Sequence, residues 1–119
     1  MSYQSFENLE AWKRSCRLAV EVNQAVNELR NFALKDQMSR SSISIPSNIA
    51  EGHERDSRPD FIGFLRIAKG SAAELRTQCY VARELEALPP TDSDRFIREC
   101  RELSAMLQGL IRSLTPTEN

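Results

Sequence analysis

Four polar side chains stand out in this 119-residue chain because their types and spacing could do chemistry. Asn48 and Glu51 lie three residues apart in the stretch Ser-Ile-Pro-Ser-Asn-Ile-Ala-Glu-Gly at residues 44–52. Ser71 and Glu74 repeat this spacing further along the chain. Residues three apart share one face of an α-helix. Paired carboxylates can serve acid–base catalysis, and the same four side chains can instead form a polar contact between helices.

Small residues around the second pair favour the structural interpretation. Gly70 and Ala73 would let another helix approach closely, and close packing would account for a glycine that costs about 1 kcal/mol of helix propensity relative to alanine. We therefore predict close packing at Gly70 and Ala73. We also predict a buried or half-buried polar cluster where two helices meet. Its members are Asn48, Glu51, Ser71 and Glu74.

Catalytic and metal chemistry find little support elsewhere in the sequence. His53 is the only histidine, and Glu51-Gly52-His53 lacks the Glu-x-x-His spacing of carboxylate di-metal bundles. We expect His53 to be an exposed loop residue. The three cysteines are far apart and form no Cys-x-x-Cys pair, so we expect free thiols acting as small hydrophobes. An enzyme that uses Glu51 and Glu74 is the weakest hypothesis, and no metal or cofactor is expected.

A basic stripe accompanies the helix that we expect over residues 59–85. Its four members fall within roughly a 100° arc at about 100° per residue, with Tyr80 beside them. They are Arg66, Lys69, Arg76 and Arg83. The stripe could be a solvated edge whose exposed ion pairs contribute little, or a contact for the phosphate backbone of a nucleic acid. The net charge of −1 and pI near 5.9 do not by themselves indicate nucleic-acid binding.

Helices must position these residues, because no stretch shows sustained strand alternation and glycine is scarce. Apolar residues at helical spacing, punctuated by proline and glycine, divide the chain into four segments. We expect helices over about residues 6–29, 33–51, 59–85 and 92–114. Ser5, Ser57 or Arg58, and Thr91 or Asp92 are the expected starts of the first, third and fourth helices.

The connections between these helices are short, which favours antiparallel neighbours. The prediction is an all-α protein: one domain over residues 1–119, folded as an antiparallel up-down-up-down four-helix bundle. Pro46 complicates the second helix, because proline cannot donate to the carbonyl of Ser42 and its ring crowds that carbonyl. We expect this helix to be kinked or restarted near Pro46.

Two features of the sequence bear on where in the cell the protein is expected. No apolar run approaches the ~20 residues that a membrane span needs, and no charged-then-apolar leader precedes Phe6. A cytoplasmic protein without membrane contact is expected.

Three groups of residues resemble the pattern of a known family. The first is Phe6-x-x-Leu9-x-x-Trp12. The second is Gln37-Met38 followed by Ser-Ile-Pro-x-Asn-Ile-Ala-Glu-Gly at 44–52. The third is Phe-x-x-Phe-Leu-x-Ile-Ala-x-Gly-Ser-x-x-Glu-Leu at 61–75. On these residues the chain resembles the four-helix-bundle proteins encoded in intervening sequences of bacterial 23S rRNA genes, and the resemblance extends over roughly residues 6–88.

The resemblance implies an antiparallel four-helix bundle that assembles into a ring, usually a homopentamer. A related bundle is the accessory protein of diversity-generating retroelements, which is strongly basic and binds nucleic acid. The acidic pI of this chain departs from those basic relatives. In a ring, however, one modest stripe repeats in every subunit and can form a concentrated basic rim.

Two functions remain in view. The first is a non-enzymatic ring-forming protein that binds RNA or DNA backbone through a basic rim, alone or with a partner protein. The alternative is a protein-only oligomeric scaffold or adaptor without nucleic-acid binding.

Overall fold

The computed structural model describes residues 5–116, and this part of the chain is all-α with no strand. A 3₁₀ turn, η1, precedes four long helices. The elements are η1 (Phe6–Asn8), α1 (Glu10–Val26), α2 (Phe32–His53), α3 (Arg58–Glu84) and α4 (Pro90–Leu114). The predicted four-helix fold is confirmed.

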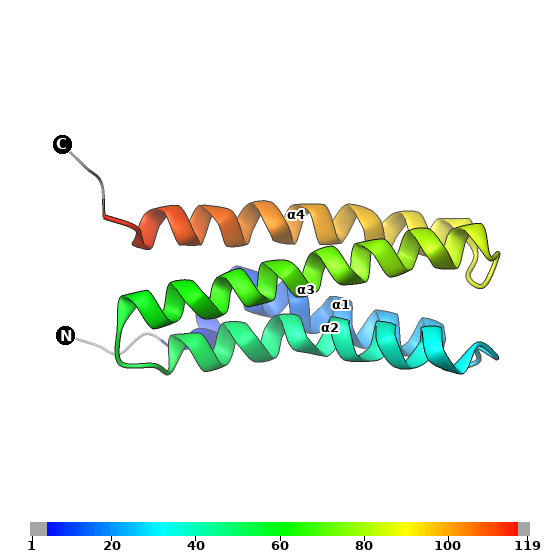
Figure 1. Ribbon diagram of the computed structural model, residues 1–119, viewed down its shortest axis with the longest axis horizontal. Coiled ribbons are helices and arrows are strands. Elements are labelled where there is room, and N and C mark those ends of the chain that lie inside the picture. The colour runs from blue at the N-terminus through cyan, green and yellow to red at the C-terminus, as the bar shows by residue number, and fades with distance from the viewer. Residues whose placement is uncertain (1–4, 117–119) are drawn as a thin grey trace.

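The helices form an elongated bundle of 49 × 28 × 20 Å. Successive helices run in opposite directions, with α3 in front of α1 and with α2 and α4 to either side (Figure 1). Apolar residues at helical spacing fill the centre. The largest fully buried apolar side chains include Phe96, Met38, Ile45, Ile49, Leu65, Leu75, Leu103 and Leu107. Burial of this shared core holds the four amphipathic helices together.

Helix ends differ from the prediction where capping differs. Ser5 accepts the backbone N–H of Glu7 and so caps η1, which leaves α1 to begin later, at Glu10. Ser57 accepts the N–H of Asp60 and caps α3 as expected. The start of α4 has no side-chain cap, and Pro90 occupies its first turn, where a missing N–H costs no helical bond.

Pro46 lies inside α2 and does not restart it. The helix is continuous from Phe32 to His53, and Pro46 is buried within it. The expectation of a fresh start near Pro46 is therefore wrong. Proline removes one hydrogen bond, and packing along a 22-residue helix can outweigh that local loss.

The close approach between α2 and α3 occurs at Gly52, and the prediction for Gly70 and Ala73 is wrong within the bundle. A Cβ added at Gly52 would lie 2.5 Å from Cβ of Phe64 and 3.1 Å from Cδ1 of Phe61. Gly70 is exposed, and a Cβ there would meet no atom within 4 Å; Ala73 is also exposed. The buried side of α3 at this level is formed by the two residues between them, Ser71 and Ala72.

Within residues 5–116, none of the helices combines the length and apolar character needed to cross a bilayer.

Candidate nucleic-acid interface

A chain of hydroxyl and amide groups joins α2 to α3. Asn48 donates from Nδ2 to the backbone oxygen of Ser44 at 2.8 Å and to its Oγ at 2.9 Å. The hydroxyl oxygens of Ser44 and Ser71 lie 2.8 Å apart. One turn earlier on α2, Ser41 donates to Oε1 of Gln78 at 2.7 Å. The seam between α2 and α3 is therefore held by neutral polar contacts.

The structure joins Asn48 to Ser71 but leaves the two predicted acids outside this network. Glu51 is exposed and pairs at 2.9 Å with Arg55, which lies just after the end of α2. Glu74 is exposed at the edge of a groove of about 410 Å³ between α2 and α3. Sequence reasoning missed Ser44, the linking residue, although it lies four positions before Asn48 and so on the same face. Two separated acids provide no paired acid–base site.

His53 is not the exposed loop residue that we expected. It is the last residue of α2, is half-buried, and lies edge-on to Phe6 at 6.3 Å and Phe61 at 5.4 Å between ring centroids. No group of three or more metal-ligating side chains occurs within the described part of the chain. His53 therefore contributes to an aromatic cluster at this end of the bundle.

The three cysteines are free thiols. Cys79 and Cys100 are buried, and burial raises the pKa of each thiol to about 12. Cys16 is only partly buried, and the same cause raises its pKa. Since the thiolate is the reactive form, the two buried cysteines are suited to packing and not to nucleophilic chemistry.

The predicted basic stripe lies mainly along the seam between α3 and α4. Lys69 donates to Oε1 of Gln108 at 2.7 Å, and Arg83 pairs with Asp94 at 2.7 Å. These two contacts fix the antiparallel register of the helices. Because the two helices are antiparallel, moving seven residues forward along α3 corresponds to moving seven residues back along α4. Arg76, seven residues after Lys69, therefore lies level with Arg101, seven residues before Gln108. Arg101 was not part of the predicted stripe.

The α4 side of this seam is basic as well. Arg101 and Arg112 are exposed, and their spacing from Gln108 places them on the α3-facing edge of α4. We call the combined set the basic strip. It consists of Arg66, Lys69, Arg76, Arg83, Arg101 and Arg112. Arg66 lies further round the exposed side of α3. Of these six cations, only Arg83 has an ion pair within residues 5–116, with Asp94.

Tyr80 lies within the basic strip but is already engaged on two sides. The guanidinium of Arg83 lies 5.1 Å from its ring centroid, and Arg101 donates to its hydroxyl at 2.8 Å. The ring therefore supports the arginines more than it offers a free surface for base stacking. The chemistry that the strip offers is a row of cations, which suits phosphates.

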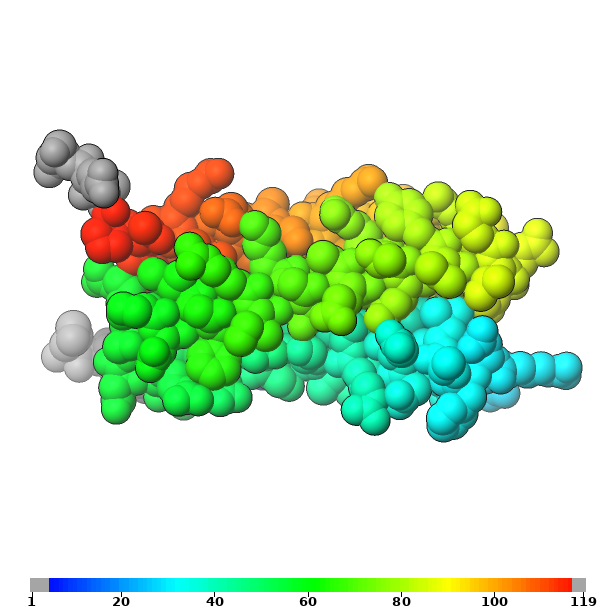
Figure 2. Space-filling view, in the orientation of Figure 1, coloured from blue at the N-terminus to red at the C-terminus, as the bar shows by residue number. Residues whose placement is uncertain are grey.

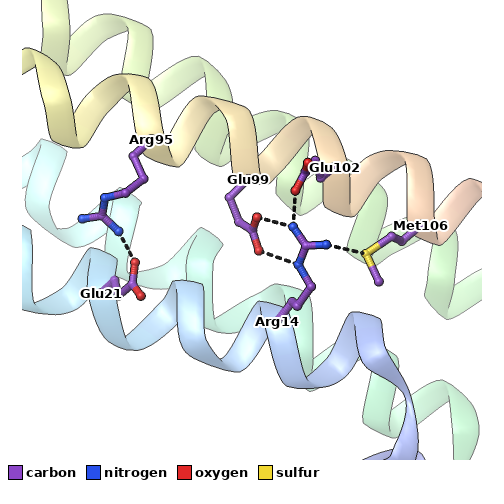
Figure 3. Close-up of polar contacts among 6 residues, drawn as sticks. All are labelled: Arg14, Glu21, Arg95, Glu99, Glu102 and Met106. Atoms are coloured by element: carbon purple, nitrogen blue, oxygen red, sulfur yellow. Dashed lines mark hydrogen bonds and ion pairs between the residues drawn. The ribbon is translucent and has the colours of Figure 1, made fainter.

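The opposite side of α4 has a different charge pattern. Arg14 of α1 binds both carboxylate oxygens of Glu99, at 2.9 and 2.5 Å, and also contacts Glu102 (Figure 3). Its remaining nitrogen lies 3.7 Å from the sulfur of Met106. Arg95 binds Glu21 further along the same seam. Here every cation shown in the figure has a carboxylate partner.

These contacts alter ionisation in the direction that strengthens them. The carboxylates of Glu99 and Glu102 raise the pKa of Arg14, and the hydrogen bond from Arg14 lowers the pKa of Glu102. Both shifts keep the pair charged at neutral pH. The acids of this part of α4 thus face α1, and the edge that faces α3 is left basic.

Comparison with known proteins identifies a family that matches most of the chain and a solved structure with the same fold. A family model described as 23S rRNA-intervening sequence protein matches residues 7–109. A crystal structure from Bacteroides thetaiotaomicron, described as a protein with unknown function from the S23 ribosomal protein family, is similar with a TM-score of 0.81. It shares 27% sequence identity, and the alignment covers 86% of this chain and 98% of that one. No curated protein matches the chain.

Proposed function

The chain belongs to the family of 23S rRNA-intervening sequence proteins, and we propose that it binds the phosphate backbone of RNA or DNA without catalysis. The basic strip is the observation that carries this proposal. Five of its six cations lack a carboxylate partner within residues 5–116. From Arg66 to Arg83 the strip extends about 25 Å at 1.5 Å per residue, long enough to follow several phosphates.

The recognition would be independent of sequence. Phosphate contacts position a protein on a nucleic acid, whereas contacts with base edges or stacking on bases would be needed to recognise a particular sequence. Tyr80 is held by Arg83 and Arg101, so the strip supports charge contacts more than stacking.

Assembly would strengthen this binding. The family resemblance implies a ring, usually a homopentamer, and we propose that this chain forms one. A ring repeats the basic strip in each subunit, so a nearly neutral chain could present a strongly positive rim. The solution mass, measured by light scattering, tests the number of copies.

A protein-only scaffold is the second candidate, and a separate observation favours it. Ile67 and Val81 of α3 and Leu85, the residue that follows this helix, are 45–57% exposed, which provides apolar surface for contact with protein. This function would need no nucleic acid, and the two candidates make opposite predictions for a binding assay.

The decisive experiment measures fluorescence anisotropy of labelled, mixed-sequence RNA and DNA duplexes at low salt. We expect binding that weakens steeply as salt rises, because cations of the protein displace counterions from the phosphates. The double variant Arg76→Glu/Arg101→Glu should lose about tenfold or more in affinity, since it reverses two cations of the strip.

The matched control is Arg17→Glu/Arg98→Glu. Both of these arginines are exposed and line the groove between α1 and α4, so the control changes net charge equally on the other side of α4. Equal loss of affinity in both double variants, or no binding by the wild type at low salt, would reject the basic strip as a nucleic-acid interface. The second outcome would favour the scaffold.

A further inference from the structure

A groove runs between α2 and α3, along the edge of α3 that faces away from Lys69, Arg76 and Arg83. The two helices lie side by side on the broad face seen in Figure 2, with α3 in the middle and α2 below. Three hollows of about 270, 370 and 410 Å³ lie along them, and Gln37 and Gln78 line all three. Because the hollows share both residues, they form one groove, which we call the α2/α3 groove.

One end of the α2/α3 groove is apolar. Ala33 and Leu34 of α2 line it together with Val81 and Leu85 on the other wall. Val81 is 45% exposed and Leu85 is 57% exposed, and the two lie four residues apart, about one helical turn. Apolar surface in a hollow gains free energy when another apolar group removes it from water. This end is therefore suited to receive apolar side chains.

The other end of the α2/α3 groove carries an acid that lacks a partner. Asp36 pairs with Arg40 at 2.9 Å, so these two charges cancel. Glu74 is exposed and has no ion pair within residues 5–116. Between the two ends, Gln78 is a neutral amide that accepts a hydrogen bond from Ser41. The uncompensated charge among the lining residues is thus negative.

The spacing of these features defines a complementary segment. Glu74 lies seven residues before Val81, which is about 10 Å along the helix axis. A second helix lying in the groove has the same rise per residue. It matches the groove when it presents two apolar residues four positions apart and a lysine or arginine seven positions from the nearer one. Amphipathic helices bind in grooves through apolar anchors at such helical spacing.

This chain does not itself offer such a segment within residues 5–116. Its large exposed apolar side chains there are Val20, Phe32, Ile43, Ile67, Val81 and Leu85. In this set only Val81 and Leu85 lie four residues apart, and the positions seven residues beyond the pair on either side are Glu74 and Asp92. Both are acids, so a second copy would bring the wrong charge to the groove. The occupant that fits is a different protein.

We propose that the α2/α3 groove binds an amphipathic helix of a partner protein. Two apolar residues of that helix cover Val81 and Leu85, and its lysine or arginine pairs with Glu74. This contact does not rest on nucleic-acid binding, and it gives the partner chemistry that the scaffold candidate leaves open. Because the groove and most of the basic strip lie along opposite edges of α3, one chain has room for a partner and a nucleic acid together.

Selection of peptides tests the pattern. A phage-displayed library of helical peptides, randomised on one face, is selected against the full wild-type chain. The binders should carry two apolar residues four positions apart and a lysine or arginine seven positions from the nearer one. Fluorescence anisotropy then measures the affinity of the selected peptide for the wild type and its variants.

Val81→Asp should weaken binding of the selected peptide about tenfold or more, because it puts a charge on the apolar wall. Val20→Asp is the matched control, since Val20 is 56% exposed on α1 and lies outside the groove. The control should change the affinity less than about twofold. Circular dichroism checks that both variants keep their helices.

A charge swap tests the ion pair without touching the apolar wall. Glu74→Lys should weaken binding of the selected peptide about fivefold or more, because it opposes the cation of the peptide. A peptide whose cation is replaced by glutamate should prefer Glu74→Lys to the wild type. Glu10→Lys makes the same charge change at an exposed position of α1 and should have little effect.

Three results in these assays would overturn the proposal: selected peptides without the pattern, equal binding to Val81→Asp and Val20→Asp, or a swapped peptide that prefers the wild type. A lower solution mass for Val81→Asp than for the wild type would also overturn it, since the groove would then hold a second copy. Val81→Asp leaves the basic strip intact, so its affinity for RNA and DNA reports on the proposed function separately.

Discussion

Helix α4 has two seams with opposite electrostatic character. On the side of α1, Arg14 is enclosed by Glu99, Glu102 and Met106, and Arg95 binds Glu21 (Figure 3). On the side of α3 lie the six cations of the basic strip, of which only Arg83 has an acid partner within residues 5–116, Asp94. The same helix therefore uses charge to hold one neighbour and accumulates charge beside the other.

The difference shows how a chain of net charge −1 can contain a basic surface. Its acids are not fewer than its cations, but two of the acids of α4, Glu99 and Glu102, are paired with Arg14 on the side of α1. Partly buried, bidentate pairs stabilise more than exposed ones, and unpaired cations in a row provide attraction for a polyanion. The first seam serves the fold, and we propose that the second serves binding.

The largest effect on stability is expected at the paired seam. Arg14→Ala removes a bidentate ion pair and leaves Glu99, whose side chain is 24% exposed, without its cation. We expect a loss of about 1–2 kcal/mol and a fall in Tm of about 4 °C or more. Thermal unfolding followed by circular dichroism measures this loss.

Arg17→Ala is the matched control for this prediction, because Arg17 lies on the same helix but is exposed. It should change stability by less than about 0.5 kcal/mol. Nucleic-acid affinity should be the same in both variants. An Arg14→Ala protein as stable as the control would mean that the paired seam is as weak as ordinary surface charge.

A smaller effect, a gain in nucleic-acid affinity, is expected at the seam between α3 and α4. Asp94→Asn removes its acid and frees Arg83, whose side chain is already 39% exposed. Affinity for a nucleic-acid duplex should rise about twofold to threefold, which corresponds to about 0.5 kcal/mol. Stability should hardly change, because the pair is exposed. Anisotropy titrations at two salt concentrations measure the gain, and a lower affinity would contradict the division between the seams.

The smallest expected effect is a pH dependence confined to the paired seam. The hydrogen bond from Arg14 holds the pKa of Glu102 below its ordinary value. The unfolded chain then binds a proton more readily than the folded one, so the stabilisation is complete above the unfolded pKa of about 4.3 and is lost as pH falls through the lower folded value.

Glu102→Gln lacks this titration and serves as the comparison. The difference in Tm between wild type and Glu102→Gln should be largest near neutral pH and shrink below about pH 4. A constant difference across this range would show that the contact does not depend on the charge of Glu102.

Local rules predicted the helices because their causes lie within a few residues. Apolar periodicity located all four, and Ser57 capped α3 as its position before Pro59 suggested. The effect of Pro46 on its helix was predicted less well. Whether a proline breaks a helix depends on what packs around it, and that information is absent from the local sequence.

The candidate site was predicted in part, for the same reason. Periodicity grouped Lys69, Arg76 and Arg83 on one side of α3, but the partner edge with Arg101 and Arg112 depends on the register of α4. Gly70 was assigned to the wrong side of the helix. Composition alone cannot tell a glycine that faces a neighbouring helix from one that faces solvent.

The order of apolar, polar and helix-ending residues by itself determined that this chain forms four helices in an all-α fold. Only the tertiary structure decided which charges meet, because side chains from α1, α3 and α4 reach one another across gaps set by packing. Periodicity fixes the face of a helix on which a residue lies. Which helix packs against that face depends on how all four helices bury their apolar stripes together.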